Sequence, residues 1–125
     1  MVQDHGEIPV HIFLHIPPQI YSKINDQVPF ECQGLHEESN ISVQDHDFGF
    51  WSLVESWTGT MHAGHDHGSG WCCPHKSMDI CFGRHSGYGG YGGWDRGARV
   101  LELQQDGSWQ SWIRMENGTA FETRI

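Results

Sequence analysis

The chain has 125 residues, enough for one domain, and its apolar content of 37% is below that of a typical globular domain. Its formal net charge is −9, from 7 basic and 16 acidic residues, with no cluster of Lys and Arg to neutralise phosphates. This charge excludes nucleic-acid binding through the usual electrostatic contacts with phosphates. The sequence contains no apolar run of about 18 residues, so it predicts no membrane span.

The first predicted element is a strand. Residues 9–16 form a short apolar run that Pro17 and Pro18 end. Their length and β-branching indicate a buried strand. His15 then lies at the C-terminal end of this strand, where α/β folds place ligand-binding groups. Residues 19–46 are polar and irregular in pattern, and we expect them to form an excursion over the surface.

A helix and a second strand are predicted next. Apolar residues between Phe50 and Trp57 are spaced as in a short amphipathic helix, for which Asp47 is a plausible N-cap. Residues 58–63 predict a strand. It would deliver the tetrapeptide Gly64-His65-Asp66-His67 at its C-terminal end.

The second half predicts loops and antiparallel strands. Most of the excess among the 16 glycines lies within residues 64–97, which favours tight backbone approaches over long helices. Strands are expected over residues 78–83, 98–104 and 109–115. The last two are joined by a segment that contains Asp106-Gly107, a strong hairpin signal.

The ten histidines are the exceptional feature of the composition, because histidine is the commonest metal ligand. His65 and His67 can both reach a concave site from a turn, and Gly64 permits a sharp exit from the strand. Strand ends of one parallel sheet meet at the same edge, so we expect His15 to join them. The alternative is that these are surface or core histidines of a His-rich protein.

Two motifs resemble a known family. Phe13-Leu14-His15-Ile16-Pro17, followed about 50 residues later by Gly64-His65-Asp66-His67, is similar to the last two metal motifs of the calcineurin-like metallophosphoesterases. The segment 81–100 resembles a glycine-rich stretch of the purple-acid-phosphatase-related branch. The resemblance implies an α/β fold: the C-terminal part of a calcineurin-like β-sandwich flanked by helices, mostly strands and glycine-rich loops here. Residues 1–125 would be a single partial domain.

The resemblance also implies ligand roles. His15 and His65 would bind the second of two metal ions, and His67 would bind the first. Asp66 is not a family ligand and would orient a neighbour. The intact enzyme would use two divalent or trivalent ions (Fe, Zn or Mn) to hydrolyse phosphate esters, with a metal-bound hydroxide attacking phosphorus.

The chain departs from the family in the remaining motifs. No Asp-x-His, bridging Gly-Asp motif or Gly-Asn-His-Asp/Glu matches, so the bridging carboxylate is missing. Three imidazoles can still bind one zinc-like ion, and we expect at most one metal and poor hydrolysis from this chain. The simplest account is the C-terminal half of a longer enzyme. The alternative is a non-catalytic, His-rich metal-binding or interaction protein, which can associate through an exposed sheet edge.

The glycine-rich segment 84–94 admits two interpretations. One is a β-arch whose aromatic residues stack on the fold. The other places Arg84 or His85 in the substrate pocket, with Arg84 as a bidentate phosphate partner and His85 as a general acid.

The four cysteines also leave alternatives open. Cys72-Cys73-Pro74-His75 with Cys81 is a possible zinc site, although adjacent cysteines seldom ligate one ion together. In an oxidising compartment, Cys72 or Cys73 would pair with Cys81, and Cys32 with the remaining cysteine.

Two acceptor sequons for N-glycosylation, Asn40-Ile41-Ser42 and Asn117-Gly118-Thr119, occur in the chain. Together with the purple-acid-phosphatase resemblance, they favour a secreted or vacuolar/lysosomal protein. The N-terminal residues lack the pattern of a signal peptide, so its leader would lie outside this sequence.

Overall fold

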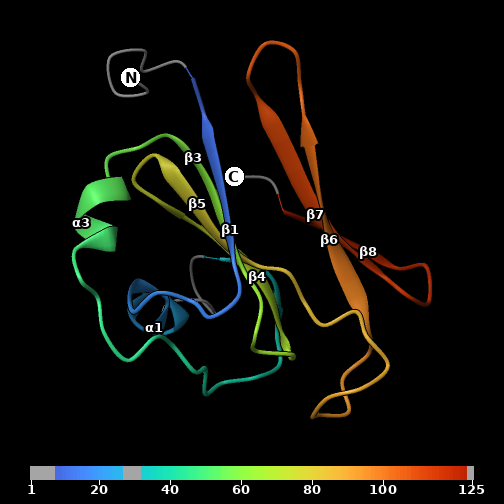
Figure 1. Ribbon diagram of the computed structural model, residues 1–125. Helices are drawn as coiled ribbons and strands as arrows, with labels where there is room; N and C mark the ends of the chain where they lie inside the picture. Colours follow the sequence, from blue (N-terminus) through green and yellow to red (C-terminus); the bar gives the residue numbers. More distant parts are fainter. Residues whose placement is uncertain (1–7, 27–31, 124–125) are drawn as a thin grey trace.

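The structure is a computed structural model, described here over residues 8–26 and 32–123 (Figure 1). In chain order its elements are β1 (Val10–Leu14), α1 (Ile20–Asn25), β2 (Gln33–His36), α3 (Phe50–Val54), β3 (Gly59–Ala63), β4 (Ser69–His75), β5 (Met78–Phe82), β6 (Gly97–Leu103), β7 (Trp109–Met115) and β8 (Ala120–Thr123). Neither helix in this part of the chain is long and apolar enough to cross a membrane.

Two sheets form the framework. Five strands make a mixed sheet in the order β1-β3-β5-β4-β2, in which β1, β3 and β5 are parallel and β4 and β5 antiparallel. The other three strands form an antiparallel sheet in the order β6-β7-β8. In Figure 1, α1 and α3 lie on one face of the five-stranded sheet, and the second sheet lies on the other. This architecture confirms the predicted α/β sandwich flanked by helices.

The apolar core lies on the helix side of the five-stranded sheet. Tyr21 is fully buried there, and its hydroxyl donates to the carbonyls of Met61 (3.2 Å) and Cys81 (2.9 Å). One helix residue thereby joins β3 to β5 and fixes where α1 packs. The buried members of this core are Tyr21, Ile24, Val54, Met61, Ala63, Trp71, Cys73, Met78, Ile80 and Phe82.

The layer between the two sheets is polar by comparison. Arg99 of β6 donates to the carbonyls of Phe82 (2.8 Å) and Gly70 (3.0 Å), and to the hydroxyl of Ser111 (2.7 Å). Burial lowers the pKa of Arg99 to about 10. This guanidinium therefore ties the second sheet to β4 and to the end of β5, the strand that leads into the glycine-rich segment.

Two disulfides cross-link the five-stranded sheet. Cys72 of β4 pairs with Cys81, its register partner on β5, and Cys73 pairs with Cys32. This is one of the pairings left open by the sequence. The zinc-site alternative is wrong, because every cysteine in the described residues is oxidised. Disulfides of this kind fit folding in an oxidising compartment.

The sequence prediction was wrong at three places before β5. Residues 19–46 are not wholly irregular, since they contain α1 and β2. The strand β4 was missed because Gly70 and Pro74 obscure its pattern. Its pairing with β2 ends at Cys72, so the missing amide hydrogen of Pro74 does not interrupt that pairing. Gly49, with φ of 99°, holds the N-cap position of α3, while Asp47 accepts a hydrogen bond from the Gly49 amide.

The predicted strands over residues 78–83, 98–104 and 109–115 are confirmed as β5, β6 and β7, whereas β8 was not predicted. Residues 78–83 were expected to form an antiparallel strand, but β5 is antiparallel only to β4 and parallel to β3. The hairpin between β6 and β7 is confirmed. Gly107 at its tip has φ of 91°, and Asp106 accepts a hydrogen bond from the Ser108 amide.

Candidate metal centre

Three parallel strands end at one edge of the five-stranded sheet and bring the predicted site residues there. β1 leads into His15, β3 into the segment 64–67, and β5 into Arg84 and His85. The ends are joined by backbone hydrogen bonds, with the Gly64 amide donating to the His15 carbonyl at 3.0 Å. This convergence follows from the parallel pairing of the strands.

His15 and His65 form a pair. Nε2 of His15 lies 3.4 Å from Nδ1 of His65, and the two rings meet edge-on with an interplanar angle of 83°. A Cβ atom at Gly64 would lie 3.1 Å from Nδ1 of His15, so glycine allows the rings to approach the turn. His65 itself has φ of 72°, a left-handed conformation that is uncommon for residues other than glycine.

His67 has different neighbours. Its ring stacks on Tyr91 at 4.2 Å between centroids and on His85 at 5.2 Å, and its Nδ1 lies 2.9 Å from the Tyr91 carbonyl. Within the described ranges, no group of three or more His, Cys, Asp or Glu residues is arranged to hold a metal ion. The three histidines therefore divide into a pair and a separate residue, and their individual ligand roles stay predictions.

Asp66 is 3% exposed and anchors a surface segment. Its Oδ1 accepts a hydrogen bond from the Ser42 amide at 2.9 Å, while Oδ2 is buried with no hydrogen-bond partner among the described residues. Burial raises the pKa of this carboxyl group, and the Ser42 hydrogen bond opposes the rise. The Asp66 side chain therefore accepts its hydrogen bond from a residue before α3, while the neighbouring His65 and His67 act on its pKa through their charge.

Arg84 is held inside the protein. Its side chain is 1% exposed and forms an ion pair with Glu37 at 2.7 Å. The same guanidinium donates to the carbonyls of Gly68 (3.0 Å) and Asp95 (2.9 Å). These contacts favour the structural interpretation of Arg84 over a bidentate grip on substrate phosphate.

His85 is engaged in a similar way. Its Nε2 lies 2.7 Å from the Trp94 carbonyl, which can only accept, so the proton is on Nε2. Nδ1 is buried with no hydrogen-bond partner among the residues that the structure describes. This geometry places His85 at the base of the glycine-rich loop and favours the β-arch interpretation. Its predicted role as a general acid stays untested.

Two residues at this edge were not singled out from the sequence. Tyr91 donates to the carboxylate of Glu38 at 2.7 Å, and its oxygen accepts from the His67 amide at 3.0 Å. Partial burial and the Glu38 contact raise the pKa of Tyr91 to about 12. Glu38 lies in a polar segment with no periodicity, and no local signal identifies it.

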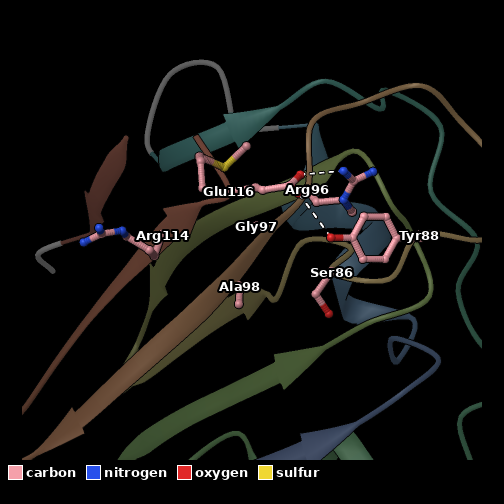
Figure 2. Close-up of a pocket in the computed structure, with 8 residues that line it drawn as sticks. Ser86, Tyr88, Arg96, Gly97, Ala98, Arg114 and Glu116 are labelled. Atoms are coloured by element: carbon pink, nitrogen blue, oxygen red, sulfur yellow. Dashed lines mark hydrogen bonds and ion pairs between the residues drawn. The ribbon is translucent and has the colours of Figure 1, made fainter. Parts of the chain in front are cut away.

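A separate pocket of about 300 Å³ lies beside the second sheet (Figure 2). Arg96 there pairs with Glu116 at 2.6 Å, and its guanidinium lies 4.2 Å from the centre of the Tyr88 ring. Figure 2 shows Arg114 pointing away from this group. Because Glu116 pairs with Arg96 within the pocket, the guanidinium of Arg96 is not free to bind a phosphate. Its lining residues are Ser86, Tyr88, Arg96, Gly97, Ala98, Arg114, Met115 and Glu116.

Comparison with known proteins identifies relatives. The chain is 30% identical to "Probable inactive purple acid phosphatase 14" of Arabidopsis thaliana, over 91% of this chain and 32% of that protein. It is 27% identical to "Probable inactive purple acid phosphatase 29" of the same plant, over 90% and 32%. The chain thus spans about a third of the length of the relatives it matches. No family model and no solved structure matches. The chain is thus similar to proteins named as probable inactive purple acid phosphatases, which confirms the resemblance predicted from its motifs.

Proposed function

We propose that this chain carries part of the metal centre of a phosphate-ester hydrolase, with His15 and His65 as two ligands of one metal ion. The observation that carries this proposal is the 3.4 Å separation of their facing nitrogens at the ends of two adjacent parallel strands. The similarity to proteins named as probable inactive purple acid phosphatases supports phosphate esters as the substrate class of the family from which the site derives.

The pair fits a metal ion of the expected kind. Two nitrogens bound tetrahedrally to zinc at about 2.0–2.1 Å lie about 3.3 Å apart, close to the observed separation. Imidazole ligands suit Zn and Fe as well as other transition metals. An ion held by His15 and His65 would supply Lewis-acid chemistry at this sheet edge. The remaining ligands of a two-metal site would come from another segment of a longer protein.

The other residues at this edge then have supporting roles. We assign His67 to the second metal position, as the resemblance implies, with Nε2 as its free nitrogen because Nδ1 is engaged by the Tyr91 carbonyl. We assign Arg84 and His85 to holding the glycine-rich loop in place. Their polar atoms are occupied by protein groups or buried, which leaves little to offer a substrate.

A non-catalytic metal-binding protein on the same framework is the second candidate function. It is supported by the word "inactive" in the printed names of both relatives, and by a site with two histidines and no third donor among the described residues. This candidate shares the His15–His65 metal and differs from the first only in turnover. Metal binding and hydrolysis must therefore be measured separately.

We further propose that residues 1–125 form a partial domain that is completed along β1 in a secreted or vacuolar protein. β1 is the edge strand of its sheet, and Phe13 on it is 67% exposed. An edge strand with an exposed aromatic side chain is suited to pairing with a further strand. Glycosylation at the two sequons belongs to the same proposal.

The test is calorimetry with Zn²⁺, followed by a p-nitrophenyl phosphate assay on the same metal-loaded chain. We expect about one ion per chain, loss of binding in His15→Ala and His65→Ala, and poor hydrolysis. His36→Ala is a matched control, because that histidine contacts Asn25 away from the pair. Absence of metal binding would overturn both candidate functions. Robust turnover would show that the chain holds a complete site.

A further inference from the structure

The glycine-rich loop closes against one face of His67, and the contact involves both the backbone and the side chain of Tyr91. We propose that Tyr91, held by Glu38, is a positioning residue that fixes His67 as the Nδ1–H tautomer. Nε2 is then the nitrogen of this ring with a free lone pair. The importance of that lone pair rests on the proposed function, but the tautomer itself does not.

The tautomer follows from the partner of Nδ1. The Tyr91 carbonyl lies 2.9 Å from Nδ1, and a carbonyl oxygen can only accept a hydrogen bond. A neutral imidazole carries one proton, so Nδ1 must hold it and Nε2 must be unprotonated. Metal-binding histidines in proteins are commonly oriented in this way, with the ring nitrogen that does not bind the metal donating to a carbonyl.

The side chain of Tyr91 keeps its own carbonyl in this position. Its hydroxyl donates to Glu38, at 2.8 Å from one carboxylate oxygen and 2.7 Å from the other. The same oxygen accepts from the His67 amide at 3.0 Å. Glu38 is in turn held by the Gly68 amide, which donates to it at 3.0 Å. The Tyr91 side chain is therefore held at two points, by the Glu38 carboxylate and by the His67 amide.

Packing supports the same geometry. The His67 ring stacks on Tyr91 with an interplanar angle of 20° and on His85 with an angle of 5°. A Cβ atom at Gly90 would overlap Cε1 of His67, and Gly90 has φ of 95°, so only glycine lets the loop approach this closely. The stacking and the close loop prevent the ring from turning over to present Nδ1 outward.

The direct test is long-range ¹H–¹⁵N NMR of the metal-free, ¹⁵N-labelled chain at pH 8, which reports the protonated nitrogen of each histidine. We expect His67 to be Nδ1–H, whereas free imidazole side chains favour Nε2–H. Tyr91→Phe keeps the ring but removes the hydroxyl, and should shift His67 toward the Nε2–H form. Tyr88→Phe is the control, because Tyr88 lies in the same loop and contacts Arg96.

Substitutions at Glu38 provide a second pair of variants, which change the acceptor of the Tyr91 hydroxyl and leave Tyr91 itself in place. Glu38→Gln retains an amide oxygen that can accept from Tyr91, so it should preserve the tautomer, while Glu38→Ala should shift it as Tyr91→Phe does. A His67 that is Nε2–H in the wild-type chain would overturn the proposal. An unchanged tautomer in both folded Tyr91→Phe and Glu38→Ala would also overturn it.

Metal affinity separates this proposal from the proposed function. Because His67 is assigned to the other metal position, Tyr91→Phe should leave Zn²⁺ affinity at the His15 and His65 pair unchanged. If no metal binds but the tautomer responds as described, the positioning role stands and the phosphate-ester function fails. If metal binds and the tautomer does not respond, the positioning role fails alone.

Discussion

The imidazoles of His15 and His65 meet because the strands before them pair in parallel, with Leu14 as the register partner of Ala63. Residues 50 positions apart in sequence are thereby brought to one sheet edge. The Gly64 amide extends this register by donating to the His15 carbonyl at 3.0 Å. The geometry of the pair is therefore set by the sheet and by the space that Gly64 leaves.

Gly64→Ala should displace the His15 ring relative to His65 while leaving the backbone in place. The new methyl group would lie 3.1 Å from Nδ1 of His15, tighter than ordinary contact, so the ring must move by a few tenths of an ångström. We expect Zn²⁺ affinity to fall about tenfold, with a change in melting temperature of only a few degrees. Calorimetry measures the first and circular dichroism the second. Gly87→Ala is the matched control, because a Cβ there meets nothing within 4 Å; an equal loss of affinity in this variant would contradict the steric explanation.

Arg84→Ala should lower stability more than it lowers ligand binding. The substitution leaves the carbonyls of Gly68 and Asp95 without their donor, at a cost of about 2–4 kcal/mol in the free energy of unfolding. Glu37 is half-exposed, so Glu37→Gln should cost only about 1 kcal/mol. Urea unfolding measures both. A large loss of phosphate binding in Arg84→Ala with stability unchanged would instead support the substrate role.

The parts of the fold that could be predicted are those with local signals. β1 is an apolar run ended by Pro17, and the loop after β3 begins with Gly64, so the strand ends that carry His15 and His65 were visible in the sequence. The Asp106-Gly107 hairpin likewise depends only on turn chemistry. Parallel pairing then accounts for the position of the histidine pair.

The rest depends on contacts between distant residues. α1 has only 6 residues and no capping side chain, and the packing of Tyr21 beneath the sheet is what fixes its position. Glu38 and Tyr91 are 53 residues apart, and neither lies in a periodic segment. Arg84 follows a strand in the same way as the histidines, but only its buried ion pair with Glu37 distinguishes a structural arginine from one that binds substrate.

The two disulfides should differ in their effect on stability. Cys32–Cys73 closes a segment with a sequence separation of 41, whereas Cys72–Cys81 has a separation of 9. Loop-closure entropy predicts stabilisation of about 4 kcal/mol for the first and about 3 kcal/mol for the second. Cys32→Ala with Cys73→Ala should therefore lower the urea midpoint more than Cys72→Ala with Cys81→Ala. The reverse order would mean that native contacts around Cys72 and Cys81, and not the unfolded chain, determine the difference.

His62 should make the protein less stable in mild acid. It is 7% exposed between the sheets, where Nε2 lies 2.8 Å from the Thr60 hydroxyl. Burial, together with the charges of Arg99 and His11, lowers the pKa of His62 to about 4. The unfolded chain takes up this proton near the ordinary pKa of about 6.5, before the folded protein does. The stabilisation is thus complete above pH 6.5 and is lost as the pH falls toward 4, by up to about 3 kcal/mol.

His62→Gln isolates this effect, because glutamine can still bond to Thr60 but does not titrate. The free energy of unfolding, measured by urea titration between pH 7 and pH 4, should fall less steeply in the variant than in the parent chain. Burial also lowers the pKa of His11, which leaves part of the slope in place. Burial raises the pKa of Asp79, so its protonation in the folded state opposes the loss at the acid end. Parallel pH profiles for the two proteins would show that His62 is not the titrating group responsible.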